Sequence, residues 1–325
     1  MRPDVAVVAI GRNEGERLRR CLASARAHAG TLVYVDSGST DESLAIAESL
    51  GAAIVRLDTD RPFTAARARN AGFRTAVQST PAVRYVQFVD GDCELQTAWI
   101  PTATAWLDGH ADHVAVFGRR REREPERSPY NLLCDLEWDV PPGEVLHFGG
   151  DVLLRRDAFE AVGGYRDDVI AGEEPELSVR LRARGGRIRC LPEEMTLHDA
   201  AMTRFGQWWH RTRRSGYAFA LGAALHGAAP ERHWVRETLR PWVWAAGPLL
   251  GMALSALLLG PAALAFLAVY PVRWLRLLAL PGEGMRVRAL RATALVVGSF
   301  AELHGQLGFL RDRLLGRTPR IIEYK

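Results

Sequence analysis

Short apolar runs alternate with helical segments through the first half of the chain, and this alternation limits the folds open to it. The run Val5–Ile10 is apolar throughout and too short for a signal peptide, so it predicts a buried strand. A helix follows, because apolar residues recur there at helical spacing until Gly30. The pattern predicts an α/β fold with a mostly parallel sheet and helices on both faces. The further predicted strands are 32–35, 53–57, 84–89, 151–154 and 187–191.

Two of these strands end directly in an acidic residue. Asp36 follows the strand 32–35, and Asp90 follows the strand 84–89. Ligands of parallel α/β sheets bind beyond the carboxyl ends of the strands, so both carboxylates are expected to line one cleft. Ser39 and Glu42 match a capping box, which predicts a helix that begins there and ends near Gly51.

The triplet Asp90-Gly91-Asp92 is the strongest single candidate for chemistry. Two carboxylates separated by a glycine can hold a hard divalent cation and contact a ribose, while Gly91 lets a diphosphate approach the backbone. Asp and Gly are also ordinary turn residues, and the triplet alone does not exclude a simple exposed turn. Asp36 has the same two interpretations, as a turn residue or as an acceptor for the N–H of a nucleotide base.

The basic residues fall into two groups. Arg67, Arg69 and Asn70 form either a solvated helix face or a set of donors for a diphosphate. The run 119–121 is entirely arginine and lies in a charged, proline-containing stretch, 118–131. We expect that stretch to be a solvated loop.

Acidic residues recur later in the chain at Glu173-Glu174-Pro175, where the sequence predicts a helix through Arg184 with Pro175 at its first position. Carboxylates at a helix N-terminus are explained by capping alone. The alternative is that one of them acts as a general base toward a hydroxyl group. His198 is either structural or, if the acids hold a metal ion, a candidate third ligand.

The last third of the chain differs in character. A helix rich in Trp, Phe and Arg is expected over 205–225, and the 32 residues from Pro241 to Val272 contain no charged side chain. Gly260-Pro261 interrupts this run, which predicts an apolar helical hairpin. Arginines flank the run on both sides, so the positive-inside rule places both ends and the catalytic domain on the cytoplasmic side of a membrane. A third apolar stretch, 292–310, is expected to be an amphipathic helix.

Charge and cysteine content exclude some functions. The net charge of +4 suits anionic partners, but no motif of the common nucleic-acid-binding modules is present, so no nucleic-acid partner is expected. The four cysteines form no Cys-x-x-Cys pair, which argues against a zinc site and gives no disulfide framework. A reducing cytoplasm fits this pattern best.

Taken in order, several segments resemble glycosyltransferase family 2, the inverting enzymes of the GT-A fold. The resemblance covers roughly residues 4 to 200 and is carried by a set of short motifs. They are Val5 to Glu14, Val33 to Asp41, Ala68-Arg69-Asn70-Ala71-Gly72, Phe88-Val89-Asp90-Gly91-Asp92, Gly149-Gly150-Asp151, Val162-Gly163-Gly164-Tyr165 and Gly172-Glu173-Glu174.

The resemblance implies a role for each matched position. Asp36 and the loop with Gly11, Asn13 and Glu14 would bind the nucleotide, and Arg69, Asn70 and Gly91 would lie near the diphosphate. Asp90 would contact the ribose or the metal ion, and Asp92 would bind Mg²⁺ or Mn²⁺, with His198 as the candidate third ligand. Glu174 would deprotonate the acceptor hydroxyl. The family has Glu-Asp where this chain has Glu173-Glu174, so Glu173 stays an alternative base.

The sequence and this resemblance therefore predict a metal-dependent inverting glycosyltransferase with a nucleotide-sugar donor. Its acceptor could be lipid-linked, because the catalytic domain is expected to lie beside a membrane. The processive members' Gln-x-x-Arg-Trp motif is not met at Gln207 to Arg211, which argues against a processive synthase. The alternatives are a catalytically degenerate membrane scaffold or nucleotide-sugar sensor, and a sugar-1-phosphate nucleotidyltransferase. The expected organisation is a GT-A domain over 1–203, an aromatic and basic connector over 204–235 and a membrane-associated helical region over 236–325.

Overall fold

The computed structural model describes residues 2–58, 60 and 63–317. It divides the chain into two compact units, Met1–Ala201 and Met202–Lys325. The last eight residues of the region expected over 236–325 lie outside the described residues.

The first half of the first unit is the parallel part of one sheet. Its strands lie in the order β3-β2-β1-β4, and neighbours run parallel. Gly11 of β1 pairs with Asp36 of β2, and the preceding Ile10 pairs with Asp90 of β4, so the two acids flank β1 at one edge of the sheet. The strands are β1 (Arg2–Gly11), β2 (Ala29–Asp36), β3 (Ala53–Arg56) and β4 (Tyr85–Asp90).

Beyond β4 the sheet is mixed rather than mostly parallel. β8 (Val152–Arg155) runs antiparallel to both β4 and β6, whereas β6 (His113–Glu122) and β9 (Arg187–His198) run parallel. The short strands β5 (Cys93–Leu95) and β7 (Gly143–Glu144) pair antiparallel with β9. A short apolar run predicts a strand but carries no information about its direction. The antiparallel direction of β8 could therefore not be predicted from the sequence.

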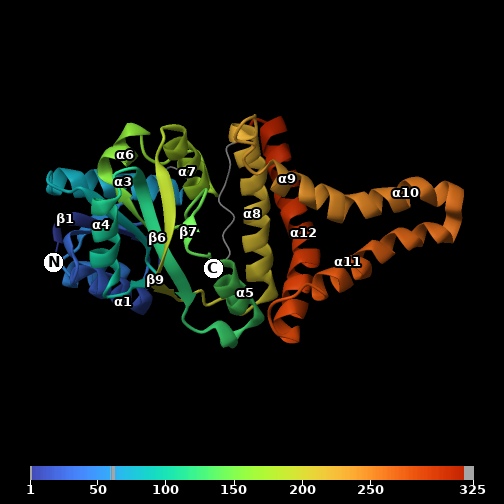
Figure 1. Cartoon of the computed structure of the whole chain (residues 1–325), viewed down its shortest axis with the longest axis horizontal. Coiled ribbons are helices and arrows are strands. Elements are labelled where there is room, and N and C mark those ends of the chain that lie inside the picture. The colour runs from blue at the N-terminus through green and yellow to red at the C-terminus, as the bar shows by residue number, and fades with distance from the viewer. Residues whose placement is uncertain (1, 59, 61–62, 318–325) are drawn as a thin grey trace. The chain divides into compact units, whose positions relative to one another are not determined.

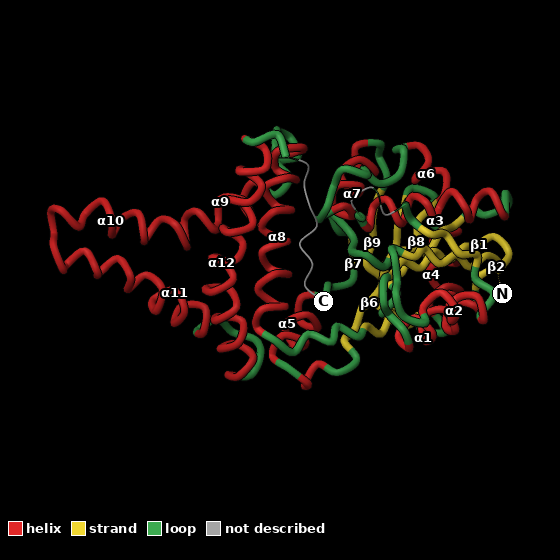
Figure 2. Tube along the Cα trace, turned by 180° about the vertical axis from the view of Figure 1, so that it is seen from behind, coloured by secondary structure: helices red, strands yellow, loops and turns green. Residues whose placement is uncertain are grey.

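Helices cover both faces of the sheet, with α1 and α2 on one side and α3, α6 and α7 on the other (Figure 2). An aromatic cluster of Phe73, Phe88, Phe159 and Tyr165 packs α3 and α6 onto β4, with ring centroids 4.5 to 5.5 Å apart. The helices are α1 (Glu16–Arg26), α2 (Ser43–Ser49), α3 (Ala65–Ser79), α4 (Trp99–Gly109), α5 (Pro129–Glu137), α6 (Arg156–Ala161) and α7 (Glu173–Ala183).

Three local predictions are wrong. The stretch 118–131 is not a loop: β6 occupies it up to Glu122, followed by the turn η1 (Pro125–Arg127) and by α5. The helix expected at Ser39 begins only at Ser43, because the Ser39 hydroxyl accepts a hydrogen bond from the backbone N–H of Asn13 instead of capping a helix. α7 begins at Glu173, so Pro175 is its third residue.

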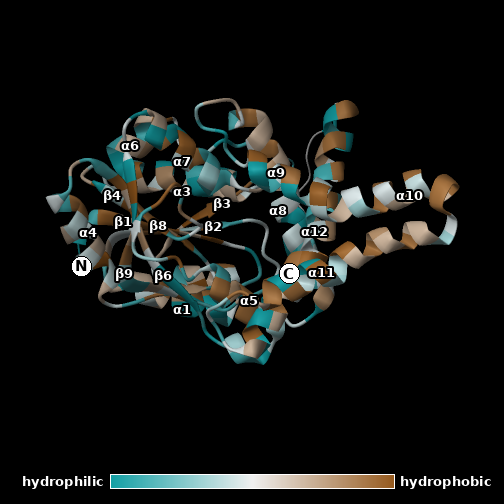
Figure 3. Ribbon diagram, turned by 45° about the vertical axis from the view of Figure 1, so that its right-hand side comes forward, coloured by the Kyte–Doolittle hydropathy of each residue, from teal (hydrophilic) through white to brown (hydrophobic). Residues whose placement is uncertain are grey.

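The second unit contains two long helices and a hairpin. α8 (Phe205–His226) packs against α12 (Met285–Leu314), which includes the stretch predicted to be amphipathic. In the sequence, a hairpin lies between these two helices: α10 extends away from them and α11 returns, as Figure 1 shows. Both arms are largely hydrophobic in Figure 3. The intervening elements are α9 (Val235–Pro241), the π-helical turn η2 (Trp242–Ala246), α10 (Gly247–Leu259), the 3-10 helix η3 (Gly260–Ala268) and α11 (Val269–Leu278).

The hairpin turns at Gly260, as the sequence predicts, where the backbone has φ +52°. Its outer face exposes large apolar side chains: Leu257 and Leu258 are 97% and 87% exposed. By length and composition, the segment 235–278 is apolar enough to cross a membrane.

Glycines let α8 and α12 approach each other closely. A side chain at Gly305 would overlap the Arg213 carbonyl oxygen of α8, and one at Gly216 would overlap the Glu302 backbone of α12. Gly308, one turn further along α12, faces more open space, because a Cβ added there would have Tyr217 Cδ2 as its nearest neighbour, at 3.9 Å. The helix pairing therefore depends on Gly305 and not on Gly308.

We expect Gly305→Ala and Gly308→Ala to change stability in opposite directions. Gly305→Ala forces the helices apart and should destabilise the protein by about 1–3 kcal/mol, the usual effect of overpacking. Gly308→Ala should stabilise it by up to ~1 kcal/mol, because alanine favours helix over glycine. Thermal unfolding of the full chain in detergent measures both, and equal effects would contradict the close approach.

Candidate active site

The loop after β1 and the loop after β2 are tied together by hydrogen bonds. Asp36 is buried, and its Oδ2 accepts from the backbone N–H groups of Gly38 and Ser39, both at 3.0 Å. Asn13, whose φ is +56°, accepts from the Thr40 N–H at 2.7 Å through Oδ1. The residues predicted to bind a nucleotide base are thus brought together at the edge of the sheet.

The same loop fixes the residues that approach β4. Glu14 forms an ion pair with Arg17 at 2.8 Å, and its backbone N–H donates to the Ser43 hydroxyl at 3.1 Å. Gly91 donates its N–H to the Ile10 carbonyl at 2.8 Å, and a Cβ at Gly91 would lie 3.1 Å from that carbonyl and 3.3 Å from Glu14 Cγ. The absence of a side chain at Gly91 therefore keeps the β1 and β4 ends together.

Arg69, on α3, gathers three carboxylates from distant parts of the chain. Its Nη2 lies 3.0 Å from Asp90 Oδ1, while Nη1 lies 3.0 Å from Glu173 Oε1 and 2.9 Å from Glu174 Oε1. The side chain is 3% exposed. Burial by itself lowers the pKa of Arg69, but the carboxylates of Glu174 and Asp90 raise it well above the ordinary value, so the guanidinium stays charged.

Glu173 and Glu174 occupy different environments at the start of α7. Glu173 is buried, and its Oε2 has no hydrogen-bond partner among the described residues. Glu174 keeps 14% of its side-chain surface exposed. Burial, together with the neighbouring Glu173 carboxylate, raises the pKa of Glu174 to about 7. A carboxyl group with such a pKa, within reach of solvent, is suited to accept a proton near neutral pH.

Asn70 faces away from this cluster. Its amide N–H₂ donates to the Tyr165 carbonyl and to Asp167 Oδ1, both at 2.8 Å, and its Oδ1 accepts from the Tyr165 N–H at 2.9 Å. Asn70 thus holds the turn that leads to α7, and its amide is not directed at the site predicted for a diphosphate.

The two acids of the Asp-Gly-Asp triplet point to different partners. Asp90 lies between the guanidinium groups of Arg69 and Arg120, at 3.0 and 3.3 Å. Asp92 is buried, and its Oδ2 lies 3.4 Å from Nε2 of His198. The ligand atoms of Asp92, Cys93 and His198 all lie within 4.8 Å of one another, a spacing that could hold a metal ion. Because burial raises the pKa of the Cys93 thiol, Asp92 and His198 are the better ligands of the three.

Three residues of this site were not assigned a role from the sequence. Arg120 reaches Asp90 and stacks over Trp138, with its guanidinium carbon 4.6 Å from the ring centroid. Asp151 accepts from the Asp90 N–H at 3.0 Å, and Glu122 accepts from His198 Nδ1 at 3.0 Å.

The sequence predicts a loop for the arginine run 119–121, but the run lies in β6 and its side chains alternate as strand residues do. Arg119 and Arg121 pair with Asp135 and Glu194, whereas Arg120 points into the site. A period of two in side-chain direction is the pattern of a strand, and three identical residues in a row conceal it.

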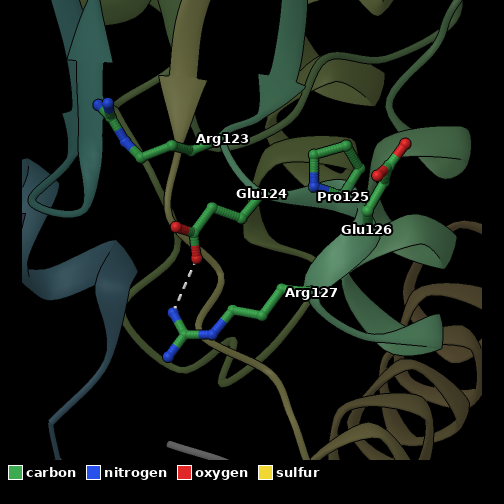
Figure 4. Close-up of a pocket in the computed structure, with 5 residues that line it drawn as sticks. All are labelled: Arg123, Glu124, Pro125, Glu126 and Arg127. Atoms are coloured by element: carbon green, nitrogen blue, oxygen red, sulfur yellow. Dashed lines mark hydrogen bonds and ion pairs between the residues drawn. The ribbon is translucent and has the colours of Figure 1, made fainter.

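A shallow hollow lies just past the end of β6 and is lined by residues 123–127 (Figure 4). Glu124 and Arg127 form an ion pair across it at 2.9 Å. It contains none of the residues predicted for the site.

The sheet, the acids at its strand ends and the helices on both faces have the arrangement of the GT-A fold. Residues 6–163 match the model of the family described as Glycosyl transferase family 2, so the first unit carries a domain of this family. The family resemblance proposed from the motifs is confirmed.

Solved structures of low sequence identity share the fold. A mannosyltransferase from Pyrobaculum calidifontis, solved with GDP-Man and Mn²⁺, matches with a TM-score of 0.64 at 19% identity, over 96% of this chain and 88% of that one. TarS of S. aureus matches with a TM-score of 0.53 at 14% identity, over 97% of this chain and 92% of that one. The same TarS fragment was also solved with UDP-GlcNAc.

A curated relative covers only part of the chain. A TPR repeat-containing protein of Synechococcus elongatus is 29% identical over 180 residues, which is 55% of this chain. The match spans 40% of that relative's length.

We expect Arg69→Met to destabilise the protein by about 3–5 kcal/mol, because it leaves buried carboxylates without their cation. Without Arg69 the pKa of Glu174, which burial already raises, rises further in the folded state. The folded variant then binds protons more tightly than the unfolded chain. The loss in the free energy of unfolding caused by Arg69→Met should therefore become smaller as the pH falls from 8 to 5. Urea unfolding at both pH values measures it.

Arg166→Met is the matched control, because Arg166 pairs with Asp168 on the surface, with side chains 40% and 68% exposed. Its loss should change stability by less than about 1 kcal/mol. A comparable effect of both substitutions would show that the Arg69 cluster contributes no more than an exposed ion pair.

Proposed function

We propose that this glycosyltransferase transfers a sugar from a nucleotide diphosphate donor to an acceptor hydroxyl with inversion of the anomeric centre. The observation that carries the proposal is the position of Glu174. It is a partly exposed acid with a raised pKa, and Arg69 joins it to Asp90, the residue that ends β4. A proton acceptor thereby lies beside the strand end where parallel sheets bind nucleotides.

The donor would bind along the edge formed by β1, β2 and β4. In this proposal Asp36 and the 11–14 loop contact the base, and Asp90 contacts the ribose. Arg69 and Gly91 lie near the diphosphate, and Asn70 acts by holding the turn before α7. The donor is a GDP sugar for one solved relative of the fold and UDP-GlcNAc for another, so both nucleotides are reasonable first tests.

The proposed cation site has a suitable donor set. Asp92 offers a buried carboxylate and His198 an imidazole nitrogen 3.4 Å away, whereas both oxygens of Asp90 face arginines. We therefore place Mg²⁺ or Mn²⁺ on Asp92 and His198, with Asp90 as an outer contributor. A cation there would neutralise charge on the departing diphosphate. In the relative from Pyrobaculum calidifontis the ion is Mn²⁺.

Glu174 would take the proton of the acceptor hydroxyl as its oxygen attacks the sugar from the side opposite the diphosphate. Arg69 holds the Glu174 carboxylate 2.9 Å away and so sets its direction. Burial, together with the neighbouring Glu173 carboxylate, keeps the pKa of Glu174 high enough for proton uptake. Glu173 remains the alternative base.

Glu174→Gln should lower turnover by about 10²–10⁴-fold, the usual contribution of a general base. Donor affinity should stay nearly constant, because the base acts only as the proton leaves. The assay screens GDP and UDP sugars by thermal shift with Mn²⁺ and then follows nucleoside diphosphate release with a lipid extract as acceptor. Release of pyrophosphate instead would favour a nucleotidyltransferase, and binding without turnover in the unmodified protein would favour a sensor.

The pH profile separates the two glutamates. With Glu174 as base, turnover should rise with pH through an apparent pKa near 7, because the protonated acid cannot accept a proton. Glu173→Gln removes a negative neighbour, lowers the pKa of Glu174 and should move this rise to lower pH. If Glu173→Gln abolishes turnover and Glu174→Gln does not, the base is Glu173.

We also propose that the hairpin holds the protein at the cytoplasmic face of a membrane, where a lipid-linked acceptor would be at high local concentration. Arg273 stacks on Trp244 at 4.8 Å, and Arg240 pairs with Glu302 at 2.6 Å, so basic and aromatic residues surround the base of the hairpin. Such residues favour a membrane interface, whereas the exposed leucines near the turn favour hydrocarbon. With both ends cytoplasmic, a spanning hairpin has its turn outside.

Ala262→Cys tests whether the hairpin spans the membrane. Ala262 is exposed in the turn and avoids the positive φ of Gly260, and all four native cysteines are buried. We expect a membrane-impermeant thiol reagent to label it in intact cells, and to label Arg286→Cys only after lysis. Labelling of both only after lysis would indicate a hairpin that dips into one leaflet. Release of the protein by salt alone would exclude both arrangements.

A further inference from the structure

Glu122 is a completely buried carboxylate at the end of β6. Hydrogen-bond donors converge on it: His198 Nδ1 lies 3.0 Å from Oε2, the Ala200 N–H lies 3.2 Å from the same oxygen, and Asn131 Nδ2 lies 3.3 Å from Oε1. Asn131 is held in place at the start of α5, because its backbone N–H donates to the hydroxyl of the capping residue Ser128 at 3.0 Å. Glu122 thus acts as an acceptor at the back of the site.

The distances favour one tautomer of His198, because Nδ1 lies closer to Glu122 Oε2, at 3.0 Å, than Nε2 lies to Asp92 Oδ2, at 3.4 Å. If Nδ1 carries the hydrogen that Glu122 accepts, Nε2 of the neutral ring carries a lone pair. That lone pair faces Asp92 Oδ2 across 3.4 Å. Two acceptors that face each other repel, unless a proton or a cation lies between them. Trp138 packs against the ring with centroids 4.5 Å apart, which limits its rotation.

We propose that Glu122 is a positioning residue that presents His198 Nε2 as a ligand and so makes the cation site prefer a first-row transition ion such as Mn²⁺ over Mg²⁺. This inference rests on the cation site of the proposed function. Mg²⁺ favours oxygen ligands and keeps much of its water, whereas an imidazole nitrogen suits transition ions better. Carboxylates behind a metal-binding histidine fix its tautomer and raise its basicity.

The test measures Mn²⁺ binding to the full-length protein by electron paramagnetic resonance, with GDP and UDP added separately as probes. Glu122→Gln should weaken Mn²⁺ binding by about 10–100-fold, the usual effect of removing such a supporting carboxylate. Mg²⁺ binding, measured by competition, should change by less than about threefold if its ligands are mainly oxygens. The ratio of the Mn²⁺ affinity to the Mg²⁺ affinity should therefore be lower in Glu122→Gln than in the unmodified protein.

A second readout separates ligand positioning from general stability. Pulsed spectra of bound Mn²⁺ should show coupling to a ring nitrogen in the unmodified protein, weaker coupling in Glu122→Gln and none in His198→Ala. Glu176→Gln is the matched control, because Glu176 is also buried but binds Arg180, at 2.6 Å, outside the site. It should leave both the Mn²⁺ affinity and the coupling unchanged.

The outcomes distinguish this inference from the proposed function. Unchanged Mn²⁺ affinity in folded Glu122→Gln, or an equal loss for Mn²⁺ and Mg²⁺, would overturn the role of Glu122 while leaving the site in place. Loss of Mn²⁺ binding in Asp92→Asn with no nitrogen coupling in the unmodified protein would keep the cation site but overturn the role of His198. If Glu122→Gln does not fold, Glu122→Asp, which withdraws the carboxylate from Nδ1, should show the same selective loss.

Discussion

The buried guanidinium of Arg69 is the interaction on which the arrangement of the site depends. Asp90 ends a strand, Glu173 and Glu174 begin a helix more than 80 residues later, and one side chain contacts all three. Three carboxylates in a largely buried position would repel one another without it. Because Arg69 is charged and central, the acids can lie close together and still differ in exposure. Glu174, the proposed base, is partly exposed, and burial together with the Glu173 carboxylate raises its pKa to about 7.

The β6 strand and α5 supply a second layer behind the Asp-Gly-Asp triplet. Arg120 faces Asp90, and Glu122, two residues along the same face of the strand, faces His198. Trp138 contacts both Arg120 and His198. One strand therefore supports both the proposed donor-binding acid and the proposed cation site. A substitution in this layer is expected to affect donor binding and cation binding together.

The second unit is stabilised by a different kind of contact. Its two long helices meet through glycines that bring backbone against backbone, and its hairpin exposes leucines that have no partner within the unit among the described residues. A soluble domain would bury such side chains, and a contiguous exposed apolar surface indicates an interaction with something apolar. The two units therefore differ in the interactions that characterise them. The catalytic unit buries paired charges, whereas the helical unit exposes apolar side chains.

The sequence by itself determined the features that depend on local pattern. Alternating apolar runs predicted the strands and helices of the parallel half, the acids at strand ends located the edge of the sheet, and the charge-free run with Gly260-Pro261 predicted the hairpin. Only the tertiary structure decided what the charged residues of β6 do, which way β8 runs and where Asn70 points. Those outcomes depend on partners far apart in the chain. Arg120 is only 14% exposed because Asp90 and Trp138 contact it, and no periodicity in the sequence indicates that pairing.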